Sequence, residues 1–441
     1  MQSHRLRRLL AVAILALAVP AVAQANTVTQ WNKTAVDTLV AFPGPAGGAA
    51  PALQIDLAMA QGAVYDAVNG IEPRHRPYLL GTPFVSTASK DAAAATAAYR
   101  VLSNIVSTVP ATIAFPNRAA LLTSLDNAYA ASLATVPDGP SKDAGVAAGT
   151  TAANAMLAAR ANDGRFGPSP WVSNTSPGHW QPLLNPDGSL QLDPTAWVAN
   201  VKPFLLRTSS QFRSEGPQAL GSTAYAVDVN ETKALGSVSS TVRSAEQTHN
   251  AIFWQTAGGP AWLWNGAARG LADSRGLDLG DSALLFAELN LASADAAINV
   301  WNDKYHFDFW RPWNAIQRAD EDGNPATEPD PDWMPLISAP YPEHPSGHLC
   351  LDGAHTRILR MFFGGAPDGG FSITSVSALL QTGEATVRHF DSFAQVVAEI
   401  VEARIWAGLH FRTADRQGKF LGQDVAGWAA SHYLRPVGHH H

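Results

Sequence analysis

The sequence contains a single cysteine, Cys350, among its 441 residues. One thiol can form neither an intramolecular disulfide framework nor a thiolate metal cluster, so neither stabilises this chain. Charged side chains are also scarce, at 15% of residues, and acidic groups outnumber basic ones by 37 to 30. A chain this acidic lacks the basic surface that nucleic-acid binding requires. Any site for an anion must therefore be a local basic pocket.

Long apolar runs are lacking beyond the N-terminus. Residues 1–25 carry three arginines and no acid, followed by an apolar stretch from Leu9 to Ala23 and the small-x-small triplet Ala23-Gln24-Ala25. This stretch is too short for a comfortable membrane span, so it predicts a cleavable signal peptide over 1–25. We therefore expect a periplasmic or secreted protein with no membrane segment after cleavage. Its remaining 27 basic and 37 acidic side chains give a net charge of −10.

Alternating strand and helix patterns are lacking as well, and helical periodicity dominates. In residues 52–71, Leu53, Leu57, Val64 and Val68 follow three- and four-residue steps or their sums. This spacing is the apolar stripe of a packed helix. Further helices are expected over 91–109, 141–163, 281–305, 352–365 and 390–410.

Two long stretches between these helices have the composition of loops. Residues 165–205 are rich in Gly, Pro, Asn and Trp, and residues 319–346 are acidic and rich in proline. Loops of this length in a compact protein are often functional. We predict an all-α protein of helical bundles and long irregular loops, forming a single domain over 26–438. The three histidines at 439–441 are typical of a purification tag and do not indicate a metal site.

The first of three candidate site stretches is WNDKYHFDFWRP, at 301–312. Lys304 and Arg311 are seven residues apart, which is nearly two helical turns, so on a helix both side chains point the same way. Two long cationic side chains in this arrangement can bracket one small oxyanion. The alternative is a solvated Lys and Arg beside an aromatic run that packs in the core.

The second stretch is PSGH, at 345–348. Ser346 offers a hydroxyl, and Gly347 lets a backbone N–H approach a ligand closely. His348 can exchange a proton near neutral pH. A helix that starts here would add the positive potential of its N-terminus. The alternative is a Pro-Ser turn that only caps this helix, and both interpretations can hold together.

The third stretch is ARIWAGLHFRTAD, at 403–415. Arg404 and His410 are six residues apart and so do not share one helical face. They converge if the helix ends near Gly408. The alternative is an amphipathic helix with a surface arginine and a core histidine.

Together the three stretches describe a pocket for an oxyanion. Lys304, Arg311 and Arg404 would neutralise its charge, while the hydroxyl and amide of the PSGH motif would bind its remaining oxygens. One histidine could bond the central atom, and the other could move protons on the opposite side. Such a cationic group repels metal cations, so zinc or iron is not expected, whereas phosphate or a phosphate mimic is.

The ordered set Lys-x6-Arg-Pro, Pro-Ser-Gly-His and Arg-x5-His resembles the signature shared by vanadium-dependent haloperoxidases and type 2 phosphatidic-acid phosphatases. The first motif, rich in Trp and Phe, is closer to the haloperoxidase branch. The stretches AQGAVYDAVNGIEP (60–73) and VKPFLLRTSSQFR (201–213) also resemble its bacterial exported members. The resemblance implies a helical fold with two four-helix bundles.

The resemblance also implies a role for each site residue. His410 would bond vanadium apically, and His348 would handle the proton at the opposite apical position. Lys304 would be the third catalytic group, polarising hydrogen peroxide. Vanadium would act as a Lewis acid. The oxygens of the vanadate cofactor would be held by Lys304, Arg311, Ser346, Gly347 and Arg404.

Two positions depart from the family pattern. The family usually has an acid four residues after the apical histidine, where this chain has Ala414, with Asp415 one residue later. The resemblance therefore does not identify the group that orients His410. Five residues before the motif serine, where bromoperoxidases have His and chloroperoxidases have Phe, this chain has Tyr341. A halide preference is therefore not transferred.

The leading hypothesis is an exported vanadium-dependent haloperoxidase, which uses hydrogen peroxide to oxidise a halide to hypohalous acid that reacts with a small organic acceptor. One alternative is a periplasmic acid phosphatase, with phosphate in the same pocket, His410 as the nucleophile of a phospho-histidine intermediate and His348 as the leaving-group acid. Another is a non-catalytic oxyanion-binding protein. Binding alone would not need both histidines, which favours the enzymatic hypotheses.

Overall fold

The structure is a computed structural model that describes residues 25–365, 369–384 and 386–438. The predicted signal peptide, apart from Ala25, and the terminal histidines lie outside the described residues. Helices dominate the described chain. Its only strands there are β1 (Phe371–Thr374) and β2 (Val387–Phe390), which form one antiparallel pair. The predicted all-α class is confirmed.

Most of the predicted helices are present with shifted ends, and the long irregular stretches lie where they were expected. The helices at 27–40, 118–134, 223–236, 245–253, 259–274, 312–317 and 412–432 were not predicted. In chain order the α-helices are α1 (Thr27–Val40), α2 (Ala50–Ile71), α3 (Lys90–Thr108), α4 (Arg118–Ala134), α5 (Pro140–Ala159), α6 (Thr223–Gly236), α7 (Ala245–Phe253), α8 (Gly259–Ser274), α9 (Leu279–Phe307), α10 (Pro312–Gln317), α11 (Gly347–Phe363), α12 (Phe393–Trp406) and α13 (Arg412–His432). Short 3₁₀ helices span Gly44–Ala46, Ala196–Asn200 and Ala319–Glu321.

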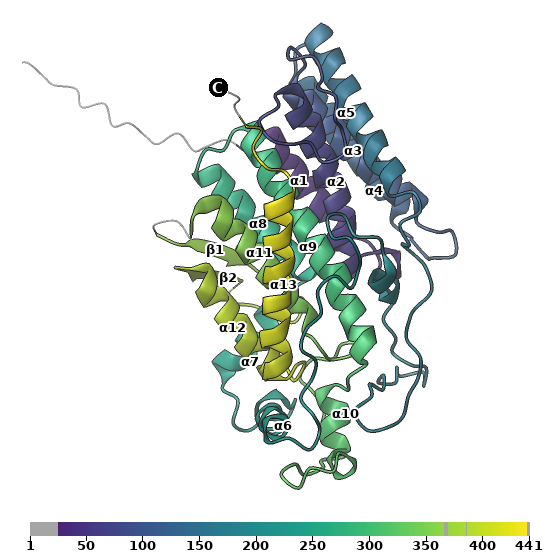
Figure 1. Cartoon of the computed structure of the whole chain (residues 1–441), viewed down its shortest axis with the longest axis vertical. Coiled ribbons are helices and arrows are strands. Elements are labelled where there is room, and N and C mark those ends of the chain that lie inside the picture. The colour runs from purple at the N-terminus through teal and green to yellow at the C-terminus, as the bar shows by residue number, and fades with distance from the viewer. Residues whose placement is uncertain (1–24, 366–368, 385, 439–441) are drawn as a thin grey trace, which may run out of the picture.

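Two groups of helices pack on opposite sides of α9. The helices α2, α3, α4 and α5 form the first group, and α8, α11, α12 and α13 belong to the second. Figure 1 shows α9 in the middle of the molecule, with α3, α4 and α5 to one side and α11, α12 and α13 to the other. Helix α9 is apolar and long enough to cross a membrane, but 94% of its most apolar 18-residue stretch is buried inside the protein. It is therefore the core helix that joins the two bundles.

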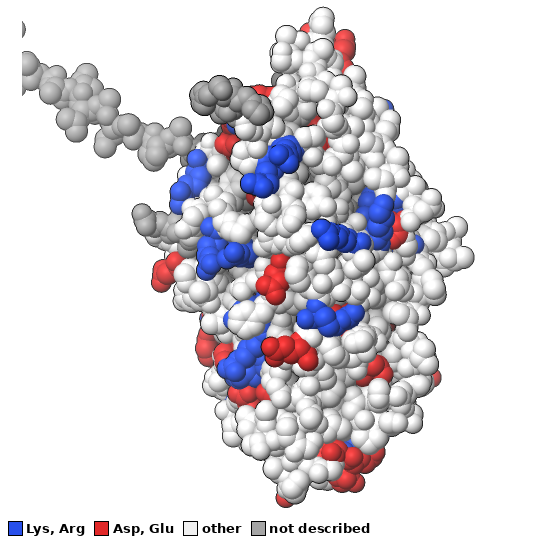
Figure 2. Space-filling model, viewed as in Figure 1, with Lys and Arg blue, Asp and Glu red and all other residues white. Residues whose placement is uncertain are grey.

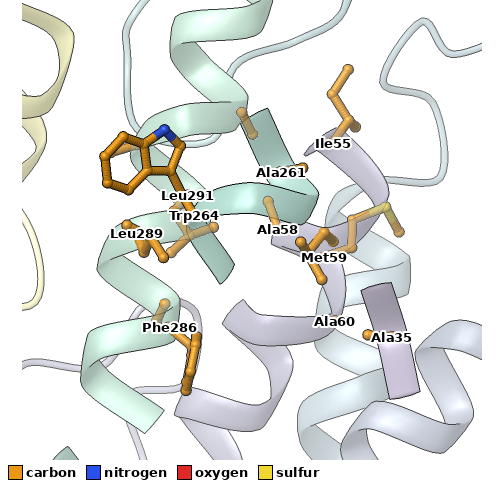
Figure 3. Close-up of a cluster of buried hydrophobic side chains, with 14 of the residues drawn as sticks. Ala35, Ile55, Ala58, Met59, Ala60, Ala261, Trp264, Phe286, Leu289 and Leu291 are labelled. Carbon is orange, nitrogen blue, oxygen red and sulfur yellow. The ribbon is translucent and has the colours of Figure 1, made fainter. Parts of the chain in front are cut away.

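The contact between α2, α8 and α9 combines large and small side chains. Figure 3 shows Phe286, Leu289 and Leu291 of α9 and Trp264 of α8 near the small residues Ala58 and Ala60 of α2. Small residues let helices approach closely, so the large side chains fill the space between them. This packing fixes α9 along its length and thereby fixes the position of Lys304 near its C-terminal end.

The crossing of α11 and α13 depends on glycine. A Cβ atom at Gly422 would lie 1.8 Å from the carbonyl oxygen of Cys350, and one at Gly353 would lie 2.3 Å from the carbonyl oxygen of Lys419. Neither distance is sterically allowed, so each backbone packs directly against the other helix. This close crossing holds the start of α11, which carries the PSGH motif, against the start of α13, which follows His410.

We predict that Gly422→Ala destabilises the protein by about 2 kcal/mol or more, because the added methyl group overlaps a backbone atom that cannot move alone. Gly427→Ala, in the same helix, is the matched control, since a Cβ atom added there would have nothing within 4 Å. The control should gain about 0.5–1 kcal/mol from helix propensity. Denaturant unfolding of both variants measures the difference, and equal midpoints would contradict the proposed crossing.

Candidate active site

A cavity of about 340 Å³ lies between the starts of α2 and α11 and the ends of α9 and α12. Its outer wall is aromatic and proline-rich, with Trp254, Trp301 and Tyr341 among the lining residues. The sequence-predicted site residues converge here from three separate stretches of the chain. Gly347, His348, Arg404 and His410 line the cavity, while Lys304, Arg311 and Ser346 are buried behind its wall.

The PSGH motif forms the N-terminus of α11. The side chain of Ser346 caps the helix by accepting a hydrogen bond from the amide of Leu349 at 3.4 Å. At Gly347, a Cβ atom would come within 2.7 Å of the Trp301 ring, so only glycine fits between this ring and the helix start. The helix-cap interpretation of the motif is correct, and the motif still presents Gly347 and His348 to the cavity.

Lys304 lies at the end of α9 and is 0% exposed. Its Nζ donates hydrogen bonds to the carbonyl oxygens of Pro342 (3.1 Å), Glu343 (3.0 Å) and Pro345 (2.7 Å). An ammonium group has three donors, so all of them are used by the turn that precedes α11. Burial, and then the charge of Arg311, hold the Lys304 pKa well below its usual range. In this arrangement Lys304 fixes the turn, and its predicted contact with an oxyanion stays a prediction.

Arg311 and Arg404 are the cations with free donors. Arg311 donates from Nε to the carbonyl oxygen of Tyr341 at 2.8 Å and from Nη1 to that of Leu409 at 2.6 Å. Arg404 donates from Nη1 to Oε1 of Gln255 at 3.2 Å. The Arg311 Nη2 and Arg404 Nε groups are buried without a hydrogen-bond partner among the described residues. Buried donors of this kind are unfavourable unless a ligand accepts from them.

His410 lies between these cations and a carboxyl group. Its Nδ1 is 2.9 Å from Oε1 of Glu343, and its Nε2 is 3.4 Å from Nη1 of Arg311. Burial, reinforced by Arg311, holds the His410 pKa well below its usual range, so the ring is neutral near neutral pH. The carboxyl group behind the ring comes from the acidic loop before PSGH, whereas Asp415 lies beside the Ser346 hydroxyl.

His348 also has a carboxyl group behind it. Its Nε2 is 3.5 Å from Oδ2 of Asp352, one helical turn later in α11, and the other carboxyl oxygen accepts a hydrogen bond from Trp264 Nε1 at 2.7 Å. Burial, and then the charge of Arg404, hold the His348 pKa well below its usual range. His348 is therefore a neutral imidazole near neutral pH, able to accept a proton. The i, i+4 spacing of His348 and Asp352 was visible in the sequence and could have identified this pair.

Tyr341 lies against the cations. Its ring centroid is 5.1 Å from Lys304 Nζ and 4.9 Å from Arg311 Cζ, and its ring packs against Trp301 at 5.1 Å between centroids. Such contacts between a cation and a ring are attractive where water is excluded. Tyr341 therefore forms the aromatic side of the pocket directly beside its charged interior.

Asp193 is a lining residue that sequence reasoning missed. Its carboxyl oxygens accept hydrogen bonds from Trp301 Nε1 at 2.9 Å, the Tyr305 hydroxyl at 3.1 Å, and the amide and hydroxyl of Thr195, both at 2.8 Å. These bonds tie the irregular region 165–205 to α9. Asp193 thus gives one of the predicted loops a structural role in the wall of the cavity.

The interior of the site is positively charged. Arg311 and Arg404 are 0% and 4% exposed. Burial lowers the Arg311 pKa only to about 10, so the guanidinium stays charged near neutral pH. Burial raises the Glu343 pKa to about 8, so this acid is largely protonated near neutral pH, and burial also raises the Asp415 pKa well above its usual range. Buried cations without an anionic partner are unfavourable, and the site therefore favours an anion.

This concentration of positive charge belongs to the interior. On the face shown in Figure 2, Lys and Arg side chains are spread among Asp and Glu, without a continuous basic stripe. Among the described residues, no group of three or more His, Cys, Asp or Glu side chains is placed to hold a metal cation. The fold and site therefore define a helical-bundle protein with a buried cationic pocket.

Comparisons with known proteins agree with this class. Residues 284–439 match the family described as the VCPO second helical-bundle domain. The chain is 28% identical over 279 residues to the vanadium chloroperoxidase of Curvularia inaequalis, a match that covers 48% of this chain and 45% of that protein. These 279 residues span less than half of that relative's length. The predicted relationship is confirmed: the chain is a relative of the vanadium-dependent haloperoxidases.

Solved structures show the same fold. The crystal structure of the first bacterial vanadium-dependent iodoperoxidase aligns with a TM-score of 0.71 at 21% identity, covering 93% of this chain and 97% of that one. A holo-type bacterial vanadium-dependent chloroperoxidase aligns with a TM-score of 0.71 at 18% identity and the same coverage of both chains. The helical-bundle architecture that the motifs implied is therefore present over nearly the whole chain.

We predict that Asp352→Asn changes the pH dependence of stability. Burial raises the Asp352 pKa from 3.8 to about 8, so the folded state keeps a proton that the unfolded chain releases above pH 4. The free energy of unfolding of the wild type therefore decreases as pH rises from about 4 to 8. The asparagine side chain cannot ionise and can still accept the Trp264 hydrogen bond. Thermal unfolding should show that the stability of the variant relative to the wild type increases between pH 5 and pH 8. A difference in stability that does not change with pH would refute the raised Asp352 pKa.

Proposed function

We propose that this protein is a vanadium-dependent haloperoxidase, which uses hydrogen peroxide to oxidise a halide to hypohalous acid. The observation that carries the proposal is the pair of buried guanidinium groups of Arg311 and Arg404, each with a free N–H donor, in the site where Arg311 Nη1 lies 3.4 Å from His410 Nε2. The relationship to vanadium haloperoxidases supports vanadate as the oxyanion in this pocket. We further propose a small organic acceptor of the hypohalous acid, and export to the periplasm or medium directed by residues 1–25.

The residues present fit vanadate. The Arg311 Nη2 and Arg404 Nε donors are free to bind its oxygens, and His410 Nε2 would bond vanadium. Gly347 lines the cavity at the N-terminus of α11, where backbone N–H groups can bind an anion. We propose Lys304 and Ser346 as further oxyanion ligands, although both now bind the protein's own backbone. When bound, vanadate supplies a Lewis acid that activates peroxide without changing oxidation state.

The proton chemistry belongs to His348. This residue lines the cavity from the first turn of α11, and its side chain is 9% exposed. Because its imidazole is neutral near neutral pH, it can take a proton from hydrogen peroxide as a general base. The Asp352 carboxyl group lies 3.5 Å from His348 Nε2, and it would stabilise the imidazolium that forms only in its ionised form, which burial disfavours below about pH 8.

A phosphatase is the second candidate, favoured by the geometry around His410. A neutral histidine with a carboxyl group at Nδ1 and arginine donors near Nε2 is also suited to attack a phosphate ester. Phosphate and vanadate share their charge and tetrahedral shape, so this pocket accepts both. In this mechanism His348 would protonate the leaving group, which requires the imidazolium form that burial disfavours near neutral pH. Simple oxyanion binding without turnover is the third candidate.

One experiment separates these candidates. The full chain is purified in phosphate-free buffer, loaded with vanadate, and assayed in parallel for peroxide-dependent bromination and phosphate-ester hydrolysis. Bromination that depends on vanadate supports the haloperoxidase. Hydrolysis that vanadate inhibits supports the phosphatase and overturns the first proposal. Tight vanadate binding with neither activity identifies an oxyanion-binding protein.

We predict that His348→Ala lowers turnover by about 10²–10⁴-fold, because the general base is lost. Vanadate affinity should change little, since the arginines and His410 remain in place. Steady-state kinetics and equilibrium dialysis with vanadate measure the two effects. Turnover close to that of the wild type would show that His348 does not handle the proton.

A further inference from the structure

The Glu343 carboxyl group forms two contacts at the same oxygen. Its Oε1 accepts a hydrogen bond from the Phe411 amide at 3.0 Å and lies 2.9 Å from His410 Nδ1. An oxygen that accepts a backbone N–H is best suited to act as an acceptor toward the ring as well. The proton between Glu343 and His410 therefore lies on Nδ1, and this holds whether or not the other carboxyl oxygen is protonated.

The opposite side of the ring gives independent support. His410 Nε2 is 3.4 Å from Arg311 Nη1, and a guanidinium group can only donate. Nε2 must then act as the acceptor, with its lone pair in the plane of the ring. In a neutral imidazole one nitrogen carries the hydrogen and the other the lone pair, so the two contacts require the same tautomer.

Glu343 itself has little freedom to move. It is 0% exposed, its amide donates to the Phe309 carbonyl oxygen at 2.8 Å, and its carbonyl oxygen accepts from Lys304 Nζ at 3.0 Å. The backbone on both sides of its side chain is therefore fixed. Asp415, the acid closest to the usual family position, lies beside the Ser346 hydroxyl instead.

We infer that Glu343 is the positioning residue of His410, which holds the hydrogen on Nδ1 and directs the Nε2 lone pair to the oxyanion. Glu343 thus takes the place of the acid that position 414 lacks. The inference deepens the proposed function, because the same lone pair serves as a vanadium ligand or as a nucleophile. A partner of this kind fixes both the tautomer and the orientation of a ligating histidine.

Three variants of the full chain distinguish hydrogen-bond geometry from charge. Glu343→Gln keeps an acceptor oxygen that the Phe411 amide selects, so it should keep the tautomer. Glu343→Met is similar in length but has no strong acceptor, so only the longer Arg311 contact would still favour this tautomer, and the fraction of His410 protonated at Nδ1 should fall. Asp415→Asn is the matched control: it neutralises the other buried acid near the motif and should leave the His410 tautomer unchanged.

The primary measurement is the tautomer of His410 by ¹⁵N NMR of protein labelled at histidine, with the resonances assigned by comparison with His410→Gln. Wild type, Glu343→Gln and Asp415→Asn should show a protonated Nδ1 and an unprotonated Nε2. A protonated Nε2 in the wild type overturns the inference. So does a tautomer that changes in Asp415→Asn, or a fraction of Nδ1-protonated His410 in Glu343→Met that equals that of the wild type.

The second measurement is the affinity for vanadate and for inorganic phosphate by equilibrium dialysis. Glu343→Met should weaken vanadate binding by about 10- to 100-fold, whereas Glu343→Gln should stay near the wild type. If Glu343→Met does not fold, the wild-type tautomer and the Gln variant still decide the inference. Failure of the wild type to bind either oxyanion would refute the proposed function, while the NMR result would still test the position of the proton.

Discussion

The removal of cationic side chains from water constrains the arrangement around the cavity. A buried ammonium or guanidinium group is tolerated only where acceptors replace its hydration. Lys304 satisfies this requirement with three carbonyl oxygens of one turn, which leaves its ammonium fully hydrogen-bonded. Arg311 satisfies it only in part, because Nη2 keeps a free donor. The protein itself therefore satisfies all the donors of Lys304, whereas Arg311 has a donor that only a ligand can satisfy.

The turn between Tyr341 and Ser346 connects most of the site. Lys304 binds it from α9, the Phe309 carbonyl oxygen accepts from its Glu343 amide, and the Ser346 amide donates to the carbonyl oxygen of Ala414 at 3.1 Å. Within six residues it supplies the aromatic wall, the carboxyl group behind His410 and the cap of α11. This short segment therefore helps to position both histidines. Its Glu343 side chain contacts His410, and its last residue, Ser346, caps the helix that carries His348.

The chemistry of the pocket specifies an oxyanion more sharply than it specifies a reaction. Guanidinium donors and a neutral imidazole recognise charge and tetrahedral shape, which vanadate and phosphate share. The relationship to vanadium haloperoxidases favours vanadate, but a shared fold does not by itself determine which reaction the site catalyses. The carboxyl group behind His410 suits either reaction, since its contact with Nδ1 favours the tautomer that leaves the Nε2 lone pair free.

The sequence alone predicted the helical class, most of the longer helices and the residues that converge on the cavity. Periodic apolar stripes are local, and the spacing of Lys304 and Arg311 can be read without knowing the fold. Helix α13 was not predicted from the sequence. Its buried stripe includes the glycines that allow close approach to α11, and glycine has a low helix propensity.

Only the tertiary structure decided which groups complete the site. Glu343 is 67 residues from His410, and Asp193 is 108 residues from Trp301, so neither contact follows from local spacing. The structure also assigned the Lys304 donors to a backbone turn, whereas the sequence indicated only a cation on the correct helical face. The residue types were determined locally by the sequence, but which donor meets which acceptor depends on the packing of distant segments.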